Sequence, residues 1–499
     1  MNEVKKQFER FLLSPAYPLF LSIYPILTLF TNNIYQLSFS FLLRPFLISV
    51  FVATLIFGGA KLFFRAWHKS AFFATLVVLF FGFYGHIKNL LDAKEVRGAS
   101  LYILGGGLLI IFFFIFFDKK NKGEFDYASL APSINLIVII LLLFPFISMT
   151  RHYTVKRIAF SSITPSFKEL DNANLEALPD IYYIIPDAYA RSDTLKEIYH
   201  YDNSEFIAEL EKDNFYIAKC GQSNYPITLL SLVSSLNIDY IPNLNERFTP
   251  EEDDILYLFA TLRKNIITEI FSTVGYEIIA FATGFPWTEM RNADIFISPP
   301  SGKMNEFEII FLQTTIAQIL DDTNLVDYEN LKAERYRERT LLVFDSLPSI
   351  AKMPGPQFVF VHIILPHPPF GFDAEGNEIN PAEVDFEEGY TNQVAYFNDE
   401  IIKSIETIKA ESETPPIIII QGDHGPPAGR PDWELRILNA YYLPEDSDSL
   451  YPGISPVNTF RLILNEYFGE NYSLLPDKSY QLETDNNYDY TLVENFCEK

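Results

Sequence analysis

The chain has 499 residues, of which 48% are hydrophobic and 16% aromatic, and its formal net charge is −26. A chain of this length holds more than one domain, and its negative charge repels nucleic acid, so we exclude nucleic-acid binding. Its two cysteines, Cys220 and Cys497, are too few for a disulfide framework or a cysteine-rich zinc site, although they could form one bridge.

The hydrophobic excess lies almost entirely before residue 150. It forms five apolar runs, at residues 13–31, 37–58, 70–87, 101–117 and 131–149. As helices, runs of roughly 17 to 22 residues span about 26 to 33 Å, which matches the hydrocarbon core of a bilayer. We therefore expect a transmembrane domain of five spans over residues 1–150. Prolines make the first span the weakest, with a cleaved signal peptide as its alternative, but no small-residue cleavage site follows.

Positive charges between the runs predict the orientation of this domain. Clusters of lysine and arginine at residues 5–10, 61–69 and 119–122 fall on one side of the membrane. That side is the cytoplasm, so we expect a multi-pass protein of the cytoplasmic membrane with its N-terminus inside and everything after residue 150 in the periplasm or outside the cell. Arg44, inside the second run, should face protein, water or a head group, unless it lies nearer the interface than the run suggests.

Beyond the spans we expect a juxtamembrane linker at residues 151–177 and a second domain at 178–499. The linker region starts with a basic stretch, TRHYTVKRIAF, at residues 150–160. Buried strands are predicted at 180–188, 276–283, 357–364 and 415–423, and amphipathic helices at 203–214 and 392–410. This alternation predicts an α/β domain with a mostly parallel central sheet. One more strand and helix are expected at 436–444 and 455–469, and the tail past residue 480 should be loosely packed.

Three of the predicted strands end in side chains that carry chemistry. Asp187 ends the first strand, His367 follows the third in IILPHPPF, and Asp423 and His424 follow the fourth in IIIIQGDHGPP. A single carboxylate after a strand is more often a turn or cap residue. Because the carboxyl ends of parallel strands meet at one edge of a sheet, we expect these side chains to share a polar pocket.

Carboxylates and imidazole in one pocket predict a divalent cation. Zn²⁺ or Mn²⁺ suits this ligand set better than Ca²⁺, and Mg²⁺ also fits. Gly422 and Gly425, on either side of Asp423 and His424, leave room for that pair to point at one ion. A metal with an open position polarises a phosphoryl oxygen and lowers the pKa of a bound hydroxyl.

The predicted nucleophile is Thr228, in CGQSNYPITLLSLVSSLN at residues 220–237. It stands at the start of an expected helix, whose N-terminus attracts anions such as phosphate or sulfate. The alternative is that Thr228 or Ser223 only caps this helix.

The order of these motifs resembles that of the alkaline phosphatase and sulfatase superfamily. It runs strand-Asp, a Pro-x-Thr-x-x-Ser turn that opens a helix, strand-His-x-Pro-Phe and strand-Asp-His-Gly, over about residues 178 to 445. Asp-His-Gly alone is a weak signal, and the order and spacing of the set make it specific. With several spans before an exterior domain, the chain looks like the membrane-anchored transferases of this superfamily, the lipoteichoic acid synthases and lipid A phosphoethanolamine transferases.

The resemblance implies a role for each matching residue. Asp187, Asp423 and His424 would be metal ligands, and Thr228 would be both a ligand and the nucleophile that forms a phosphothreonine. His367 would hold the substrate phosphate or protonate the leaving alkoxide.

Other positions match the family less well. Arg191 could steady the phosphoryl group, with an ordinary surface position as the preferred alternative. Two-metal members of the superfamily supply a histidine well after Asp-His-Gly, and none follows His424 here, which implies one metal ion. His362 could partly fill a second site, but its place inside a strand favours a buried structural histidine.

The resemblance implies that the protein transfers a phosphorylated head group, of the phosphoglycerol or phosphoethanolamine type, from a membrane phospholipid to a surface glycan or lipid. One alternative is hydrolysis of a phosphate or sulfate ester by the same residues. The Cys/Ser-x-Pro/Ala-x-Arg motif of sulfatases is absent from the chain. The other alternative is a catalytically silent membrane protein of envelope assembly.

Overall fold

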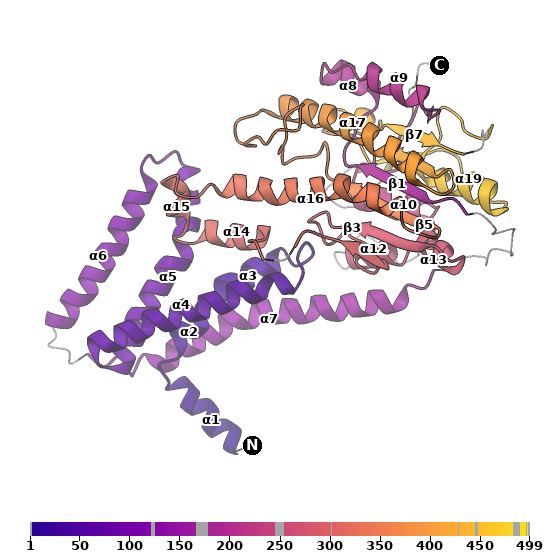
Figure 1. The fold of residues 1–499 in the computed structure, drawn as a ribbon. Helices are drawn as coiled ribbons and strands as arrows, with labels where there is room; N and C mark the ends of the chain where they lie inside the picture. Colours follow the sequence, from indigo (N-terminus) through magenta and orange to yellow (C-terminus); the bar gives the residue numbers. More distant parts are fainter. Residues whose placement is uncertain are drawn as a thin grey trace. The chain divides into compact units, whose positions relative to one another are not determined.

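A computed structural model describes residues 2–120, 125–165, 178–244, 254–300, 302–427, 429–444, 448–482, 490–495 and 497. The chain forms two compact units (Figure 1). The first consists of Met1–Thr154 with Gly302–Lys332, and the second of Val155–Ser301 with Ala333–Lys499. The boundaries expected from the sequence did not include the return of residues 302–332 to the first unit.

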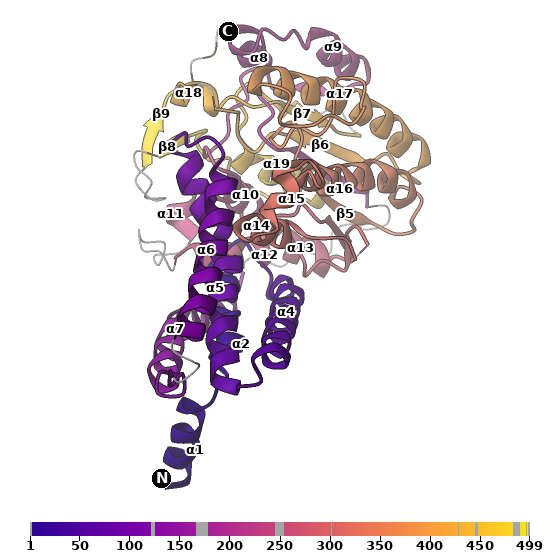
Figure 2. The ribbon, with the colours of Figure 1, turned by 90° about the vertical axis from the view of Figure 1, so that its left-hand side faces the viewer.

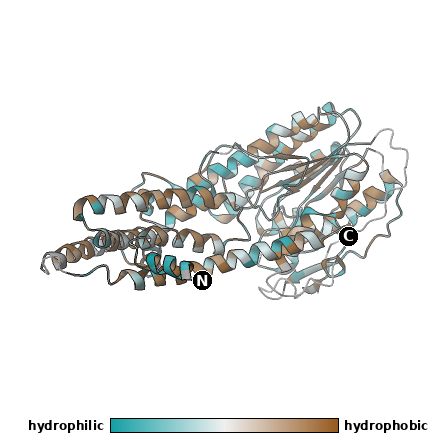
Figure 3. Cartoon of the chain, turned by 90° about the horizontal axis from the view of Figure 1, so that it is seen from below, coloured by the Kyte–Doolittle hydropathy of each residue, from teal (hydrophilic) through white to brown (hydrophobic). Residues whose placement is uncertain are grey.

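The first unit is built from apolar helices. They are α1 (Asn2–Leu12), α2 (Tyr17–Leu21), α3 (Tyr24–Asn32), α4 (Ser40–Phe64), α5 (Trp67–Asp92), α6 (Ala99–Lys120) and the first part of α7 (Ala131–Ser162). Among the described residues, four helices, α4 to α7, are long and apolar enough to cross a membrane. Figure 3 shows hydrophobic residues along these helices. A bent pair, Glu3–Leu12 with Tyr17–Asn32, brings the number to five if it counts as one span.

The first predicted span, at residues 13–31, is not a straight helix. Helix α1, which precedes this span, and Tyr17–Asn32 are bent by 84° against each other. Within the span, proline explains why the helix restarts, because it cannot donate a backbone hydrogen bond inside a helix but is well placed in a first turn. Pro18 and Pro25 stand in the first turns of α2 and α3, so the run restarts at each of them.

Residues 302–332 contribute two short helices to the first unit, α14 (Glu306–Thr314) and α15 (Gln318–Asp322). A capping box between Asn305 and Glu308 starts α14. The ring centroids of Phe307 and Phe30 lie 5.9 Å apart. At the end of α14 the chain touches α5 at Gly85, where a Cβ would lie only 2.1 Å from the carbonyl oxygen of Gln313. Glycine is thus needed at residue 85 for this close approach.

Arg44 lies in the first turns of α4 and faces the returning segment. Its Nε lies 3.2 Å from Glu308 Oε1, and its side chain is 49% exposed. It also donates to the carbonyl oxygens of Gly302 and Lys303. A protein partner and a position near the helix end were both expected from the cost of placing arginine in lipid.

The second unit is centred on a seven-stranded sheet in the order β2-β7-β6-β1-β5-β3-β4. The strands are β1 (Ile181–Pro186), β2 (Tyr216–Ile217), β3 (Glu277–Phe281), β4 (Ile295–Ile297), β5 (Gln357–Ile363), β6 (Ile417–Gln421) and β7 (Asn439–Tyr442). Every pair is parallel except the two that β7 makes with β6 and β2. Strands β1, β3, β5 and β6 are the four buried strands predicted from the sequence, and β7 falls within the further strand expected at 436–444. The predicted fold class is confirmed.

The helices of this part of the chain are α8 (Ser192–Ile198), α9 (Ser204–Lys212), α10 (Thr228–Leu236), α11 (Ile241–Leu244), α12 (Asp254–Arg263), α13 (Ile266–Thr273), α16 (Tyr328–Ile350), α17 (Phe386–Glu411), α18 (Pro431–Glu434) and α19 (Pro456–Phe468). Helices such as α16 and α17 on one side and α10 and α19 on the other lie on the two faces of this sheet (Figure 2). Because side chains alternate along a strand, Tyr182 of β1 joins the core beneath α16 and α17, and Tyr183 packs on Phe460 of α19 at 5.1 Å. Burial on both faces explains why the strands read as continuous apolar runs.

The C-terminal tail is more ordered than expected where the structure describes it. A hairpin pairs β8 (Ser479–Leu482) with β9 (Tyr490–Val493). The expectation of a loosely packed tail is wrong for these residues, and residues 483–489 lie outside the described part of the chain.

A buried carboxylate at the start of the sheet gives a testable pH dependence. Asp180 precedes β1, accepts the Gln357 N–H at 3.0 Å and is only 7% exposed. Burial raises its pKa from 3.8 to about 6, with a smaller contribution from Glu413, and the hydrogen bond opposes this shift. A raised pKa contributes stability below the unfolded value, and that contribution is lost as pH rises through the folded value.

Asp180→Asn keeps the acceptor and removes the charge. We therefore expect the full-length variant to melt at a higher temperature than the wild type at about pH 8, with the gap narrowing towards about pH 4. Thermal unfolding in detergent at several pH values measures the gap. A difference in melting temperature that does not change with pH would contradict the raised pKa of Asp180.

Candidate metal and phosphoryl-transfer site

The central strands of the sheet bring three of the candidate side chains together. Asp187 directly follows β1, His362 is the penultimate residue of β5, and Asp423 stands two residues after β6. Since β6, β1 and β5 are adjacent, their carboxyl ends lie side by side. Ligand atoms of Asp187, His362 and Asp423 all lie within 4.8 Å of one another, and all three residues are buried.

The parallel register explains the contact between Asp187 and His362. Ile185 pairs with His362, so Asp187, two residues later, leaves β1 on the same face as the histidine. The Nε2 atom of His362 lies 3.2 Å from Oδ2 of Asp187. This histidine therefore orients the carboxylate through one oxygen and leaves Oδ1 for another partner.

Asp423 is positioned by close backbone packing. A Cβ at Gly422 would lie 2.7 Å from the carbonyl oxygen of Tyr189, and one at Gly425 would lie 3.0 Å from that of Glu434. Both glycines thus allow the close approach predicted from the sequence. The N–H of Ala188, whose φ of 62° is left-handed, donates to Asp423 Oδ1 at 3.0 Å.

Thr228 is the first residue of α10 and is 7% exposed. Its Oγ1 lies 3.2 Å from Nε2 of His424. The other ring nitrogen of His424, Nδ1, lies 2.8 Å from the Gly425 carbonyl oxygen, which can only accept, so Nδ1 carries a hydrogen there. The Nε2 atom of His424 therefore faces Thr228.

The other three residues predicted from the sequence as metal ligands lie around His424. Its Nε2 lies 3.2 Å from Thr228 Oγ1, 3.5 Å from Asp423 Oδ2 and 3.8 Å from Asp187 Oδ1. A tetrahedral ion with bonds of about 2.0 to 2.2 Å separates its ligand atoms by roughly 3.3 to 3.6 Å. The distances to Thr228 and Asp423 are close to this range, and the distance to Asp187 is longer. Among the described residues, the group of His and Asp ligand atoms that lie mutually close comprises Asp187, His362 and Asp423.

The hydrogen bonding of the two carboxylates favours a bound cation. Within the described residues, Asp187 Oδ1 and Asp423 Oδ2 are buried oxygens without a hydrogen-bond partner. Leaving buried charged oxygens unpaired is costly, so a cation beside them satisfies the site. These are also the two carboxylate oxygens nearest to His424 Nε2.

The charges of the site are mutually supportive. Burial alone would raise the pKa of Asp187, but the hydrogen bond from His362 and the charges of His367 and His424 outweigh it and lower the pKa to about 2. Burial alone would lower the pKa of His424, and the carboxylates of Asp423 and Asp187 reverse this and raise it. The pocket thus favours the ionised form of Asp187, which metal binding requires, and His424 would have to release its proton to become a ligand.

His367 lies in the loop after β5, close enough for its charge to act on Asp187. Gln393 of α17, which is completely buried, fastens this loop. Its Nε2 donates to the carbonyl oxygens of Pro366 and His367, both at 3.2 Å. Its Oε1 accepts the Gly371 N–H at 2.9 Å. A residue distant in sequence therefore positions the predicted acid.

Arg191 lies near the site but is fully engaged within the protein. It is 6% exposed, so the surface position preferred for it from the sequence is wrong. Its Nε and Nη2 donate to the two oxygens of Asp193 at 2.8 and 2.6 Å, and Nη1 donates to the Gly221 carbonyl oxygen at 3.2 Å. Arg436 donates to the same Asp193 at 2.9 Å. These hydrogen bonds join the segment after Asp187, the segment before Thr228 and the segment after His424.

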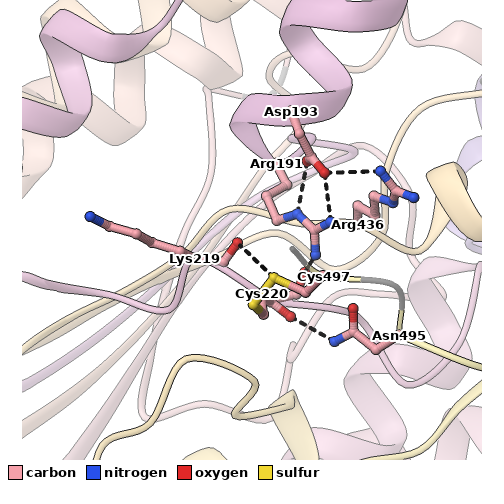
Figure 4. The surroundings of a disulfide bond; sticks show 8 residues. Arg191, Asp193, Lys219, Cys220, Arg436, Asn495 and Cys497 are labelled. Atoms are coloured by element: carbon pink, nitrogen blue, oxygen red, sulfur yellow. Dashed lines mark hydrogen bonds and ion pairs between the residues drawn. A yellow bond between two sulfur atoms is a disulfide. The ribbon is translucent and has the colours of Figure 1, made fainter. Parts of the chain in front are cut away.

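Cys220 and Cys497 form a disulfide beside these hydrogen-bonded side chains, as Figure 4 shows. The bond joins the loop that leads to Thr228 to the last residues of the chain. Asn495 adds a hydrogen bond at 2.8 Å to the carbonyl oxygen of Cys220. The bridge left open by the sequence is therefore present.

Sequence reasoning underestimated His362 and did not identify Gln393. The alternation of side chains along β5 indicates which face His362 lies on. Its contact with Asp187 also depends on the pairing register of β5 with β1, which the sequence does not give. No comparable signal exists for Gln393, a polar residue of a helix 26 positions after His367.

No protein-family model and no curated protein matches the chain. Among solved structures, the C-terminal periplasmic domain of EcEptC from Escherichia coli matches at 14% identity and a TM-score of 0.42, covering 66% of this chain and 97% of that domain. The integral membrane protein lipooligosaccharide phosphoethanolamine transferase A from Neisseria meningitidis matches at 14% identity and a TM-score of 0.34, covering 86% of this chain and 88% of its own. BT1596, a 2-O GAG sulfatase, matches at 12% identity and a TM-score of 0.37, covering 60% and 72%.

At 12 to 14% identity and TM-scores of 0.34 to 0.42, these matches carry no argument about the chemistry of this chain.

Proposed function

We propose that the protein is a metal-dependent phosphotransferase that moves a phosphorylated head group from a membrane phospholipid, through Thr228, to a hydroxyl of a surface glycan or lipid. One observation carries the proposal. The Thr228 hydroxyl, at the start of α10, lies 3.2 Å from His424 Nε2, beside two buried carboxylate oxygens without partners. A nucleophile, a cation site and a helix N-terminus that attracts phosphate thus coincide.

Asp187, Asp423, His424 and Thr228 would hold the ion, and His362 would orient Asp187 through its second oxygen. When bound, a divalent ion lowers the pKa of the Thr228 hydroxyl, so that its proton is lost to water, and offsets charge on the phosphoryl oxygens. The ligands favour Zn²⁺ or Mn²⁺, and Mg²⁺ also fits.

In the first half-reaction, Thr228 Oγ1 forms a bond to the phosphorus of the lipid's phosphodiester. The bond from phosphorus to the diacylglycerol oxygen breaks, and His367 gives that oxygen a proton. The first turn of α10 holds the phosphate with its unpaired N–H groups. The head group then remains on Thr228 as a phosphodiester.

In the second half-reaction, an acceptor hydroxyl gives its proton to His367 and attacks the same phosphorus, and Thr228 leaves. The two steps conserve the ester bond for transfer, whereas direct attack by water would lose it. Apolar helices in the same chain suit a donor that lies in the membrane. We expect the site to face the periplasm or the exterior, with the N-terminus in the cytoplasm.

Hydrolysis of a phosphate or sulfate ester by the same residues is the second candidate. Incubation of the full-length protein in vesicles with head-group-labelled phosphatidylethanolamine or phosphatidylglycerol and a glycolipid extract separates the two. Label that moves to a second lipid or glycan supports transfer, and label released only into water supports hydrolysis. If the label neither moves to another molecule nor enters the water in a metal-dependent way, both candidates are contradicted and a silent envelope protein remains.

Gln393→Glu tests the positioning of His367. The variant keeps the acceptor for Gly371 but replaces the two N–H donors to Pro366 and His367 with an oxygen that repels their carbonyls. We expect turnover to fall by about 10- to 100-fold, because a misplaced catalytic group loses about that much, with bound metal unchanged. Turnover equal to the wild type, or a parallel loss of metal, would argue against a positioning role.

A further inference from the structure

A basic cluster is formed by Lys156, near the end of α7, with Arg263 and Arg291. The proposed phosphotransfer chemistry does not involve these residues. Lys156 and Phe160 are four residues apart on α7 and therefore on one face. The guanidinium of Arg263, the last residue of α12, lies 5.7 Å from the centre of the Phe160 ring. Lys156, Arg263 and Arg291 are close enough for their positive charges to repel one another.

The carboxylate of this cluster, Glu289, is already committed to other partners. Its Oε2 accepts from Arg291 Nε at 2.6 Å. Its Oε1 accepts the backbone N–H groups of Thr283 and Gly284, at 3.1 and 3.0 Å. Its side chain is 1% exposed. The three positive charges of the cluster therefore share one buried carboxylate, and both oxygens of that carboxylate already accept hydrogen bonds.

Several donors of the cluster are available to a ligand. Within the described part of the chain, Lys156 has neither a hydrogen bond nor an ion pair. Arg263 donates its Nε to the Glu289 carbonyl oxygen at 3.1 Å and its Nη2 to that of Pro286, which leaves Nη1. Arg291 uses only Nε among the described residues, and its side chain is 38% exposed. These remaining donors are those that bind phosphate oxygens.

The position of Lys156 along α7 suggests where the ligand comes from. It stands seven residues after Met149, the end of the fifth apolar run, or about 10 Å along the helix. The head-group layer begins where the hydrocarbon core ends, and long basic side chains extend towards it. Trp287 directly follows Pro286, whose carbonyl oxygen accepts a hydrogen bond from Arg263. Tryptophan is enriched in the head-group layer.

We propose that Lys156, Arg263 and Arg291 form a site for the phosphate of a membrane phospholipid head group. A phosphodiester carries one negative charge, which offsets part of the excess positive charge of the cluster, and its oxygens accept from guanidinium and ammonium donors. The site lies outside the Thr228 chemistry, so its existence does not depend on the proposed function.

Native mass spectrometry of the full-length protein, titrated with phosphatidylglycerol in detergent, tests this site. We expect Lys156→Gln combined with Arg291→Gln to weaken the tightest phosphatidylglycerol binding at least about tenfold, since the variant removes two charged hydrogen-bond donors to the phosphate. Lys156→Arg with Arg291→Lys keeps the charges and should retain the affinity. Equal binding by the charge-neutralised variant and the wild type would overturn the proposal.

Three comparisons isolate the lipid phosphate. Lys352→Gln removes an exposed cation of the same unit, paired with Glu411, and should leave binding unchanged. Diacylglycerol, which lacks phosphate, should bind at least about tenfold more weakly than phosphatidylglycerol. Glycerol 3-phosphate should not displace the lipid at equal concentration. An equal loss in Lys352→Gln, equal binding of diacylglycerol or equal competition by glycerol 3-phosphate would each contradict a specific lipid site.

Discussion

Thr228→Ala is expected to lower turnover by at least about 1,000-fold and to abolish the covalent adduct, because it removes the hydroxyl that lies 3.2 Å from His424 Nε2 and is proposed to form the ester. The measurement is mass spectrometry of the peptide that contains residue 228 after incubation with phospholipid, together with transfer of label. Thr228 is also an expected metal ligand, so bound metal is determined on the same sample. The wild-type peptide should gain the mass of the phosphorylated head group, and the alanine variant should not.

Thr228→Ser is the matched control, since it keeps the hydroxyl and removes one methyl group. We expect it to retain measurable turnover and to carry the adduct on the same peptide. If the alanine variant, melting like the wild type, still transfers label, the nucleophile is a different residue. Adduct on another peptide of the wild type would lead to the same conclusion.

The central sheet was predictable because burial on both faces leaves a strong signal. Residues 417–420 are four consecutive isoleucines, and all are fully buried in β6. The two-residue β2 at the edge of the sheet carries a weaker pattern, since edge strands are short and meet fewer partners. The antiparallel β7 lies within the strand expected at 436–444. Strand order was not predictable, because a strand pattern does not name its neighbours.

The site was predictable as far as single strand ends could reveal it. Asp187, Asp423 and His424 each end or follow a strong strand, and Thr228 opens a helix, so topology alone brings them to one edge. The role of His362 depends on its pairing register with β1, and that of Gln393 on the packing of α17. Both are tertiary properties that local patterns do not encode.

The return of residues 302–332 to the first unit was not predictable for a similar reason. Helix α14 is nine residues long and has an ordinary capping box, with nothing in its composition that indicates a distant partner. Its place depends on the fit between Gly85 and the end of α14 and on the ion pair of Arg44 with Glu308. The sequence did indicate that Arg44 needed a partner, but the identity of that partner came from the fold.

Removal of one ligand carboxylate should empty the metal site. Asp187→Asn and Asp423→Asn are close in shape to the wild type, but each replaces a charged ligand with a neutral amide. We expect metal content after dialysis to fall below about one tenth of the wild-type value, because each variant removes a direct ligand of a four-coordinate site. Elemental analysis of the purified full-length protein measures this, and Asp180→Asn, a buried carboxylate outside the site, should leave metal content unchanged.

His362→Ala distinguishes an orienting residue from a ligand. The histidine contacts Asp187 through Oδ2, while Oδ1, the oxygen without a partner, lies nearest to His424 Nε2. Loss of an orienting hydrogen bond typically weakens metal affinity by about 10- to 100-fold, so we expect the variant to refill to one ion per chain when metal is in excess. A variant that stays empty under those conditions, as Asp187→Asn should, would make His362 a ligand in its own right. The first coordination shell would then include the Asp187, His362 and Asp423 set, and Thr228 would be freer to act as a nucleophile alone.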